Sequence, residues 1–263
     1  MGARRTLGIA LAATLLAAAP TRAQPPCPCP TPATAYPLLA PPRPRRLTRV
    51  QGTLRPFFNL LGSGGGAIGE LAVEHYFDFP LKIGAEIFPA AVAVQSGGGG
   101  AITHLRLEAA FASDLLEVGL AAGERTENLG AGGLSLAGRL RLGALDGLNL
   151  RLTYGYAVIR NRYTDRVRVA FSNVLTTIEV PLMTGLAAVV DGGFSFDVWL
   201  YGTVGVKHVL VGQGGAGTWS ARAGFGIAWV LDRFPCQYRN PDRCHGSAWG
   251  VGPTIAVGVE HRF

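Results

Sequence analysis

The chain has 263 residues, of which 48% are apolar and 16% charged, with 37 glycines and a formal net charge of +7. After the N-terminal segment no run of about 18 consecutive residues is apolar and uncharged, so no transmembrane helix is predicted. All of the net positive charge lies in residues 1–49, and the neutral remainder argues against a nucleic-acid partner, which would select a basic face.

Residues 1–23 have the organisation of an export signal. Arg4 and Arg5 form a basic start, and residues 7–19 form an apolar stretch too short to span a bilayer. Thr21 and Ala23 then place small residues at the −3 and −1 positions of a cleavage site. The sequence therefore predicts a signal peptide that is removed on export.

Residues 24–47 are predicted to form a proline-rich tail. Nine prolines fall between residues 24 and 46, and this density favours extended, unpacked backbone. Cys27 follows glutamine and two prolines and not small residues, so lipid attachment is not predicted. Cys27 and Cys29 are too close in sequence for an unstrained mutual disulfide, which leaves pairing between chains or free thiols.

Residues 48–263 show the alternation of β-strands. Between residues 104 and 111, for example, leucine, alanine and phenylalanine occupy the odd positions, whereas histidine, arginine and glutamate occupy the even positions as far as 108. A helix would scatter these residues around its circumference. The same alternation recurs along the segment, so we expect strands that are apolar on one face and polar on the other.

The connections between these strands alternate in length. Short turns are expected at residues 78–80, 112–114, 145–147, 182–185 and 212–217. Longer loops are expected at residues 62–66, 96–100, 124–132, 161–165 and 232–247, with a weakly marked bend at Tyr201 and Gly202. The pattern predicts about twelve strands, with ten as the alternative, and both chain ends on one side. The alternation changes parity at residues 172–176, which a β-bulge would explain.

The last strand carries a terminal signature. A glycine, Gly258, precedes alternating apolar positions and a final Phe263. This resembles the terminal signal of outer-membrane β-barrel proteins of Gram-negative bacteria, although His261 stands at a position that is usually apolar in that signal. The resemblance covers residues 48–263 at the level of architecture and matches no subfamily.

The resemblance implies an all-β fold, an antiparallel transmembrane β-barrel. It also implies an outer-membrane location, contact with outer-membrane lipid, and insertion by the barrel-assembly machinery through the terminal strand. The tail and the C-terminus would then be periplasmic. Closure is independently expected, because a sheet in lipid cannot leave an unpaired edge. The alternative is a soluble lipocalin-like barrel or sandwich, which would carry its charges outside.

No catalytic, cofactor or metal site is predicted. Four residues would be enough in number to bind a metal ion: Cys27, Cys29, Cys244 and His245. The expected topology, however, puts the tail and the loop on opposite sides of the membrane. The glycine-rich stretches lack the Lys and Ser/Thr of a phosphate loop. His104 is the one histidine expected on a polar strand face; no serine is placed near it, and we expect it to join an ion-pair network.

The expected lumen carries the charged residues. The acids come from the early strands and the arginines from the next three, in the order Glu70, Glu74, Glu86, Glu108, Glu117, Arg139, Arg141, Arg151, Arg166 and Arg168. One hypothesis is a narrow, porin-like diffusion pore for small polar solutes. The alternative is a structural or surface-interaction barrel whose lumen is sealed by ion pairs. An outer-membrane lipid hydrolase is least favoured, because the sequence shows no set of catalytic residues for it.

We predict a disulfide between Cys236 and Cys244 in cell-derived protein, because both lie in one loop of an exported chain. The bridge closes a small loop, so it should contribute only about 2–3 kcal/mol. Mass spectrometry under non-reducing conditions should detect the linked peptides. Two free thiols would contradict the prediction, whereas replacement of both cysteines by serine should leave the barrel folded.

Overall fold

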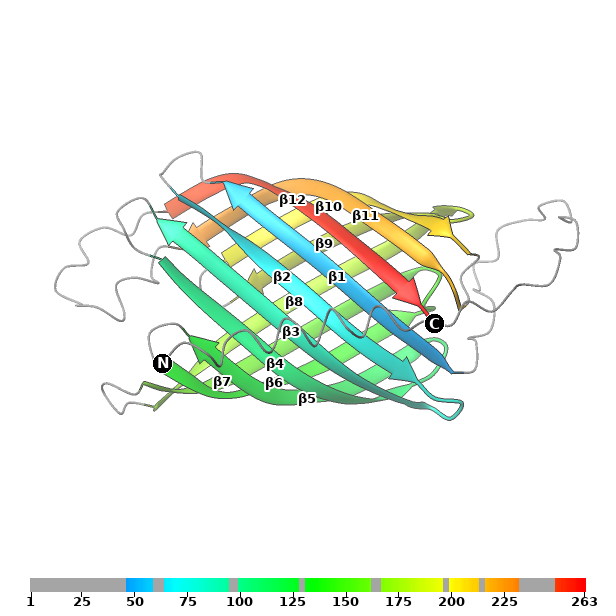
Figure 1. Cartoon of the computed structure of the whole chain (residues 1–263), viewed down its shortest axis with the longest axis horizontal. Helices are drawn as coiled ribbons and strands as arrows, with labels where there is room; N and C mark the ends of the chain where they lie inside the picture. The colour runs from blue at the N-terminus through cyan, green and yellow to red at the C-terminus, as the bar shows by residue number, and fades with distance from the viewer. Residues whose placement is uncertain are drawn as a thin grey trace, which may run out of the picture. The chain divides into compact units, whose positions relative to one another are not determined.

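The chain, in a computed structural model, forms a closed barrel of twelve antiparallel strands (Figure 1). Consecutive strands pair with each other, and β1 pairs with β12 to close the sheet. The structure describes residues 46–58, 64–94, 99–127, 131–161, 167–195, 199–212, 216–231 and 249–263. The expected signal peptide, nearly all of the tail and all four cysteines lie outside these residues. The predicted all-β barrel is confirmed, with twelve strands and not ten.

The strands are 10 to 17 residues long. Their bounds are β1 Leu47–Phe58, β2 Gly64–Tyr76, β3 Leu81–Val94, β4 Gly99–Ala112, β5 Leu116–Glu127, β6 Ala131–Gly143, β7 Asn149–Asn161, β8 Val167–Met183, β9 Leu186–Ser195, β10 Trp199–Val211, β11 Trp219–Leu231 and β12 Trp249–Arg262. None of the described residues belongs to a helix long and apolar enough to cross a membrane.

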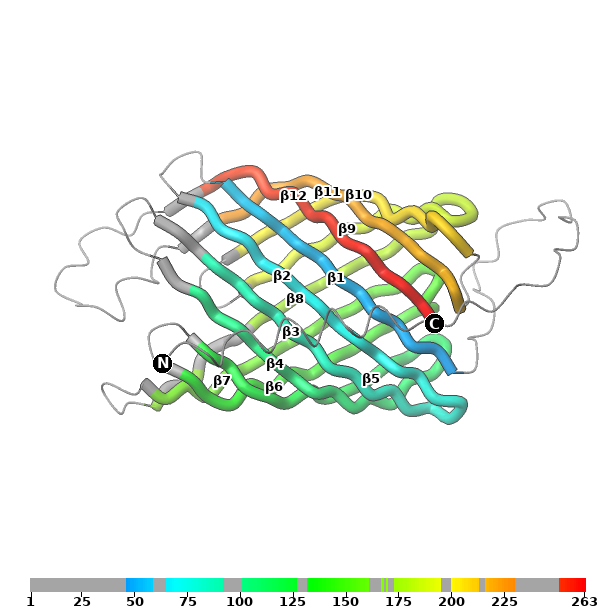
Figure 2. The backbone as a smooth tube through the Cα atoms, in the orientation of Figure 1, coloured from blue at the N-terminus to red at the C-terminus, as the bar shows by residue number. Residues whose placement is uncertain are grey.

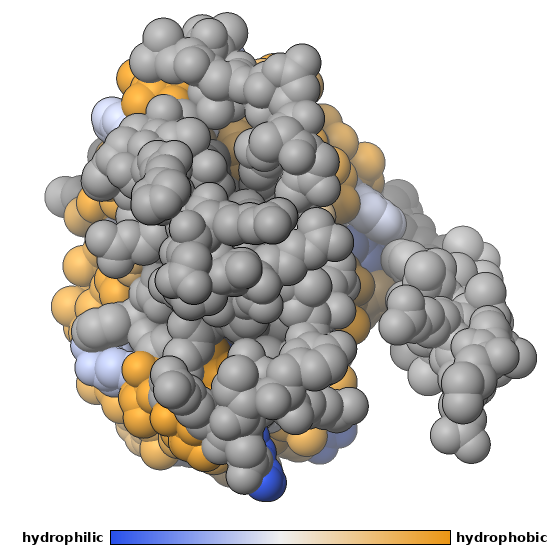
Figure 3. Space-filling model, turned by 90° about the vertical axis from the view of Figure 1, so that its left-hand side faces the viewer, coloured by the Kyte–Doolittle hydropathy of each residue, from blue (hydrophilic) through white to orange (hydrophobic). Residues whose placement is uncertain are grey.

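The outer face of the barrel is apolar and the inner face is charged. Leu107, Leu120 and Phe225 are 68%, 75% and 76% exposed, whereas Arg106 and Glu108, the sequence neighbours of Leu107, are buried. Figure 3 shows hydrophobic residues in orange along the coloured parts of the wall. A soluble barrel would have the opposite arrangement, so that alternative is excluded, and the wall is that of a transmembrane barrel.

The predicted parity change is a β-bulge in β8. Gly155 of β7 lies opposite Asn173, and the next residue, Tyr156, lies opposite Phe171. Ser172 is therefore an extra residue in β8, as the change of alternation near this point predicted. Beyond the bulge, the buried side chains of Asn173 and Glu179 lie at odd-numbered positions, so the odd positions between them face the interior.

The expected bend at Tyr201 and Gly202 is wrong. Both residues lie inside β10, opposite Gly193 and Gly192 of β9, and the connection falls at residues 196–198. A Cβ atom built on Gly202 would meet no atom within 4 Å, so this glycine reflects an open outward position and not a turn. The strands also run further than expected at residues 124–127 and 131–132, and β1 begins one residue earlier, at Leu47.

One end of the barrel carries the short turns. The shortest is Thr184 and Gly185 between β8 and β9; Gly185 has a φ of 75°, which glycine adopts without strain. The start of β1 and the C-terminus lie at this same end, on the right of Figure 2. An even number of antiparallel strands requires this arrangement.

The terminal strand β12 closes the barrel against β1 and β11. The backbone N–H of Phe263 donates to the carbonyl oxygen of Thr48 at 2.8 Å, at the end of the β1–β12 ladder. His261 stacks on Trp219 with ring centroids 4.0 Å apart and contacts the ring of Phe263 edge-on at 4.2 Å. An aromatic group at the rim explains how a histidine takes a position that is usually apolar.

Deletion of residues 259–263 should abolish heat-modifiable folding and recovery in the outer-membrane fraction. The deletion leaves backbone groups of β1 and β11 unpaired in lipid, each at a cost of several kcal/mol. Gel mobility of unheated samples and membrane fractionation measure the effect. As a control, deletion of residues 28–32 from the tail removes an equal length and should leave folding intact. Normal folding of the first variant would contradict the closing role of β12.

Candidate functional site

The candidate site is the charged interior of the barrel. Of the acids predicted there, Glu74, Glu86, Glu108 and Glu117 are buried, and Glu70 is partly buried. Of the arginines, Arg141 is buried, while Arg139 and Arg151 are partly exposed to the interior, with side chains 13% and 21% accessible. Arg168 lies in β8 opposite Ile159, and Arg166 lies outside the described residues.

Lys82 of β3 holds three carboxylates together. Its Nζ atom lies 3.1 Å from Glu74 and 2.7 Å from Glu108, and it also pairs with Glu117. These glutamates come from β2, β4 and β5, and the lysine side chain is only 1% exposed. The lysine neutralises charges that would otherwise repel one another. The sequence places Lys82 on the polar, inward face of β3, between Leu81 and Ile83. The predicted set of lumen charges nevertheless did not include Lys82.

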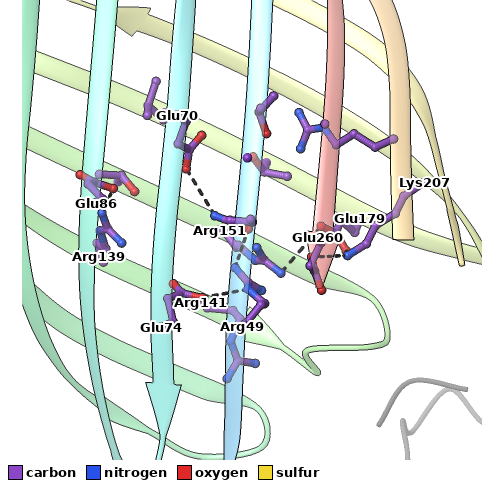
Figure 4. A pocket seen from close by; sticks show the side chains of 18 of the residues that line it. Arg49, Glu70, Glu74, Glu86, Arg139, Arg141, Arg151, Glu179, Lys207 and Glu260 are labelled. Carbon is purple, nitrogen blue, oxygen red and sulfur yellow. Dashed lines mark hydrogen bonds and ion pairs between the residues drawn. The ribbon is translucent and has the colours of Figure 1, made fainter. Parts of the chain in front are cut away.

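Arg139 of β6 crosses the interior to the early strands. It pairs with Glu86 of β3, beside which it lies in Figure 4. It also pairs with Glu108 of β4 at 2.5 Å. Neither strand is adjacent to β6 in the sheet, so these pairs bridge space inside the barrel. Arg106 also binds Glu86 at 3.0 Å, and Arg49 binds Glu74 at 2.9 Å. The predicted acidic and basic groups thus meet in one network.

A second network lies among the later strands. Lys207 is 2.9 Å from Glu260 and 3.5 Å from Glu179, and Arg262 is 2.7 Å from Glu260. Arg222 of β11 pairs with Asp191 of β9, also among the later strands. The separation of acidic and basic sectors suggested by the sequence is therefore incomplete, because Lys82 lies among the acids and three further acids lie beyond the arginines.

His104 has a serine neighbour that strand order did not reveal. Its Nδ1 atom lies 2.7 Å from Ser135 Oγ, although β4 and β6 are separated by β5. The β5 residue between them, opposite Ser135, is Gly123, which has no side chain to fill the gap. Ser135 also accepts a hydrogen bond from Arg106 Nε at 2.8 Å.

This serine–histidine pair is not arranged for hydrolysis. A nucleophile must be reachable by substrate, but His104 is 1% exposed and Ser135 is fully buried. The pair is instead part of the interior hydrogen-bond network, through Arg106 and its partner Glu86. The position of His104 agrees with the expectation of a lumen histidine joined to ion pairs.

An apolar cluster fills the interior toward the end opposite the short turns. Its members come from six strands: Phe57, Ile68, Phe88, Ala90, Ile102, Tyr201 and Ala228, with Leu175 packed against them. β4 and β10 stand half a barrel apart in the sheet order, yet both contribute to this cluster. The cluster therefore extends along about half of the inner wall, from β10 through β1 to β4.

A small cavity lies within the charged region. The space open to the centre of a water molecule is about 100 Å³, so several water molecules fit there. Arg49, Arg151, Glu179 and Glu260 are among the residues that line it (Figure 4). Twelve strands enclose less space than the sixteen or so of an aqueous porin channel. Side chains that reach beyond their neighbouring strands, such as Arg139, occupy part of that space.

Comparisons with known proteins show a weak structural likeness but no sequence match. No protein-family model matches the chain, and no curated protein matches it. Among solved structures, the chain is similar to a FadL homologue from Pseudomonas aeruginosa, with 6% sequence identity and a TM-score of 0.41. That match covers 83% of this chain and 90% of the other. The class, a transmembrane β-barrel with a charged interior, rests on the geometry of this chain.

Replacement of Lys82 by alanine should destabilise the barrel by about 3–5 kcal/mol, because it leaves buried carboxylates without their cation. Arg46, whose side chain is 77% exposed and pairs with Asp78 at the rim, provides the control. Its replacement by alanine should cost only about 0–1 kcal/mol. Urea titration of refolded protein measures both values. Equal losses of stability in the two variants would contradict the role of Lys82 as the cation that neutralises the buried carboxylates.

Proposed function

We propose that the chain is an integral protein of a bacterial outer membrane whose lumen is closed at rest. It would act as a structural or surface-interaction barrel and not as an open diffusion pore. The outer-membrane location is supported by the export signal, the aromatic terminal strand and the apolar outer wall. Insertion through β12 by the barrel-assembly machinery, and periplasmic placement of the short turns and both chain ends, belong to the same proposal.

The observation that carries the closed lumen is the pair of barriers in series. Arg139 reaches from β6 to Glu86 and Glu108, three and two strands away, and the apolar cluster buries side chains of β1 to β4, β10 and β11. An ion crossing the barrel would have to break the first barrier and then leave water to pass the second. Both steps are expensive, because they strip an ion of its solvation.

The rival function is a narrow pore for small polar solutes. The polar cavity is the feature that supports it, since water or an ion fits there. A pore also needs this cavity to connect to both ends, and the apolar cluster lies toward one of them. The rival therefore requires a second conformation in which Phe57, Phe88 and Tyr201 move apart.

Refolded wild-type protein should give no steady conductance in planar bilayers. Because the barriers act in series, Phe88→Ala or Arg139→Ala alone should stay closed, and the combined variant should conduct. A matched control, Leu107→Ala with Leu120→Ala, removes apolar bulk from the outer wall and should remain silent. Heat-modifiable mobility verifies that each variant has folded. Steady conductance of the wild type would favour the diffusion pore.

A further inference from the structure

The surface of the lumen cavity is richer in cations than in acids. Eight basic and six acidic side chains line it. Two further acids pair with cations of the lining but do not line the cavity themselves: Asp191 pairs with Arg222, and Glu108 pairs with Arg139. A group inside the cavity therefore faces mainly the nitrogen atoms of arginine and lysine. In a low-dielectric interior such an excess favours bound negative charge.

Arg151, together with Arg55, is the least well paired of these cations. Among the described residues, its one acidic partner within 4 Å is Glu179, at 3.7 Å, a distance too long for a hydrogen bond. Its Nε and Nη2 atoms are buried without any hydrogen-bond partner. A guanidinium has five N–H donors in a fixed fork, so Arg151 leaves much of its donor capacity unused.

The position of Arg151 in the sheet makes this shortage worse. Arg141 lies directly opposite it in the β6–β7 register, and like charges in that position destabilise a sheet. Arg141 is satisfied elsewhere, by Glu117 and by the carbonyl oxygens of Ser113 and Asp114. Nothing comparable in the described residues satisfies Arg151.

Two more arginines of β1 contribute to the same cavity. Arg49 pairs with Glu74 at 2.9 Å and donates to Gln51 at 2.8 Å, but its Nη1 atom is buried without a hydrogen bond. Arg55, with a side chain 4% exposed, has its nearest acids at 3.8 and 3.9 Å and two nitrogens without hydrogen bonds. Arg49 and Arg151 both line this cavity (Figure 4).

We propose that this cavity binds one compact inorganic anion, with Arg151 as the principal ligand and Arg49 as a second one. The anion would accept hydrogen bonds from the unpartnered guanidinium nitrogens and separate Arg151 from Arg141 electrostatically. The cavity has room for a compact anion such as chloride, sulfate or phosphate. The inference holds whether the lumen conducts or is closed, so it goes beyond the proposed function.

The test compares anions at constant ionic strength. Wild-type protein is refolded in zwitterionic detergent with sodium gluconate, whose anion is too bulky for the cavity, and is then titrated with sodium chloride, sulfate or phosphate. The thermal midpoint of the folded form should rise by several degrees and saturate at millimolar concentration for at least one anion. A linear, non-saturating rise would reflect general salt exclusion and would overturn the proposal.

Arg151→Gln tests the assignment of the site. This variant should lose the saturating response, whereas Arg46→Gln, which removes a cation at the rim, should keep it. In gluconate alone Arg151→Gln should be at least as stable as wild type, because it relieves the repulsion from Arg141. An unchanged response in Arg151→Gln would overturn the proposal. If that variant does not fold, wild-type crystals grown in sodium bromide decide: an anomalous peak beside Arg151 supports the site, and its absence refutes it.

Discussion

Charge has no place on the outside of a sheet that is surrounded by hydrocarbon, and the rest of this structure follows from that constraint. Each backbone group must pair within the sheet, which forces closure, and each ionisable side chain must point inward. Twelve strands then enclose a space narrow enough for long side chains to reach one another. The interior charges must be neutralised by partners on other strands, and Lys82 and Arg139 do this for the acids of the early strands.

Small inward residues make these crossings possible. Gly123 leaves room for His104 and Ser135 to meet across β5, and a Cβ atom there would lie 1.9 Å from the carbonyl oxygen of Leu105. Gly258 serves β12 in the same way, since a Cβ atom on it would lie 3.2 Å from Arg222. The high glycine content is thus a packing requirement of the charged interior as well as a feature of loops.

Much of the architecture was predictable because strand alternation is a local property. The strand number, the inward set of charges and the bulge at Ser172 follow from parity along the chain. Partners inside the barrel were not predictable, because they depend on the stagger between strands and on distances across the lumen. The Ser135 partner of His104 and the three acids around Lys82 belong to this class. The bend placed at Gly202 failed for another reason: a glycine in a strand resembles a turn when its neighbours are unknown.

Two features define the proposed barrel: hydrocarbon covers the outer wall, and interior side chains close the lumen to bulk water. Site-directed spin labels on the protein in lipid bilayers test both halves, through collisions with oxygen and with a water-soluble nickel complex. Labels at Leu107 and Leu120 should collide with oxygen and not with nickel, as expected for positions in hydrocarbon. A label at Thr177, which borders the cavity, should be shielded from nickel. Strong nickel collisions at Thr177 would contradict the closed interior, and strong nickel collisions at Leu107 would contradict the transmembrane wall.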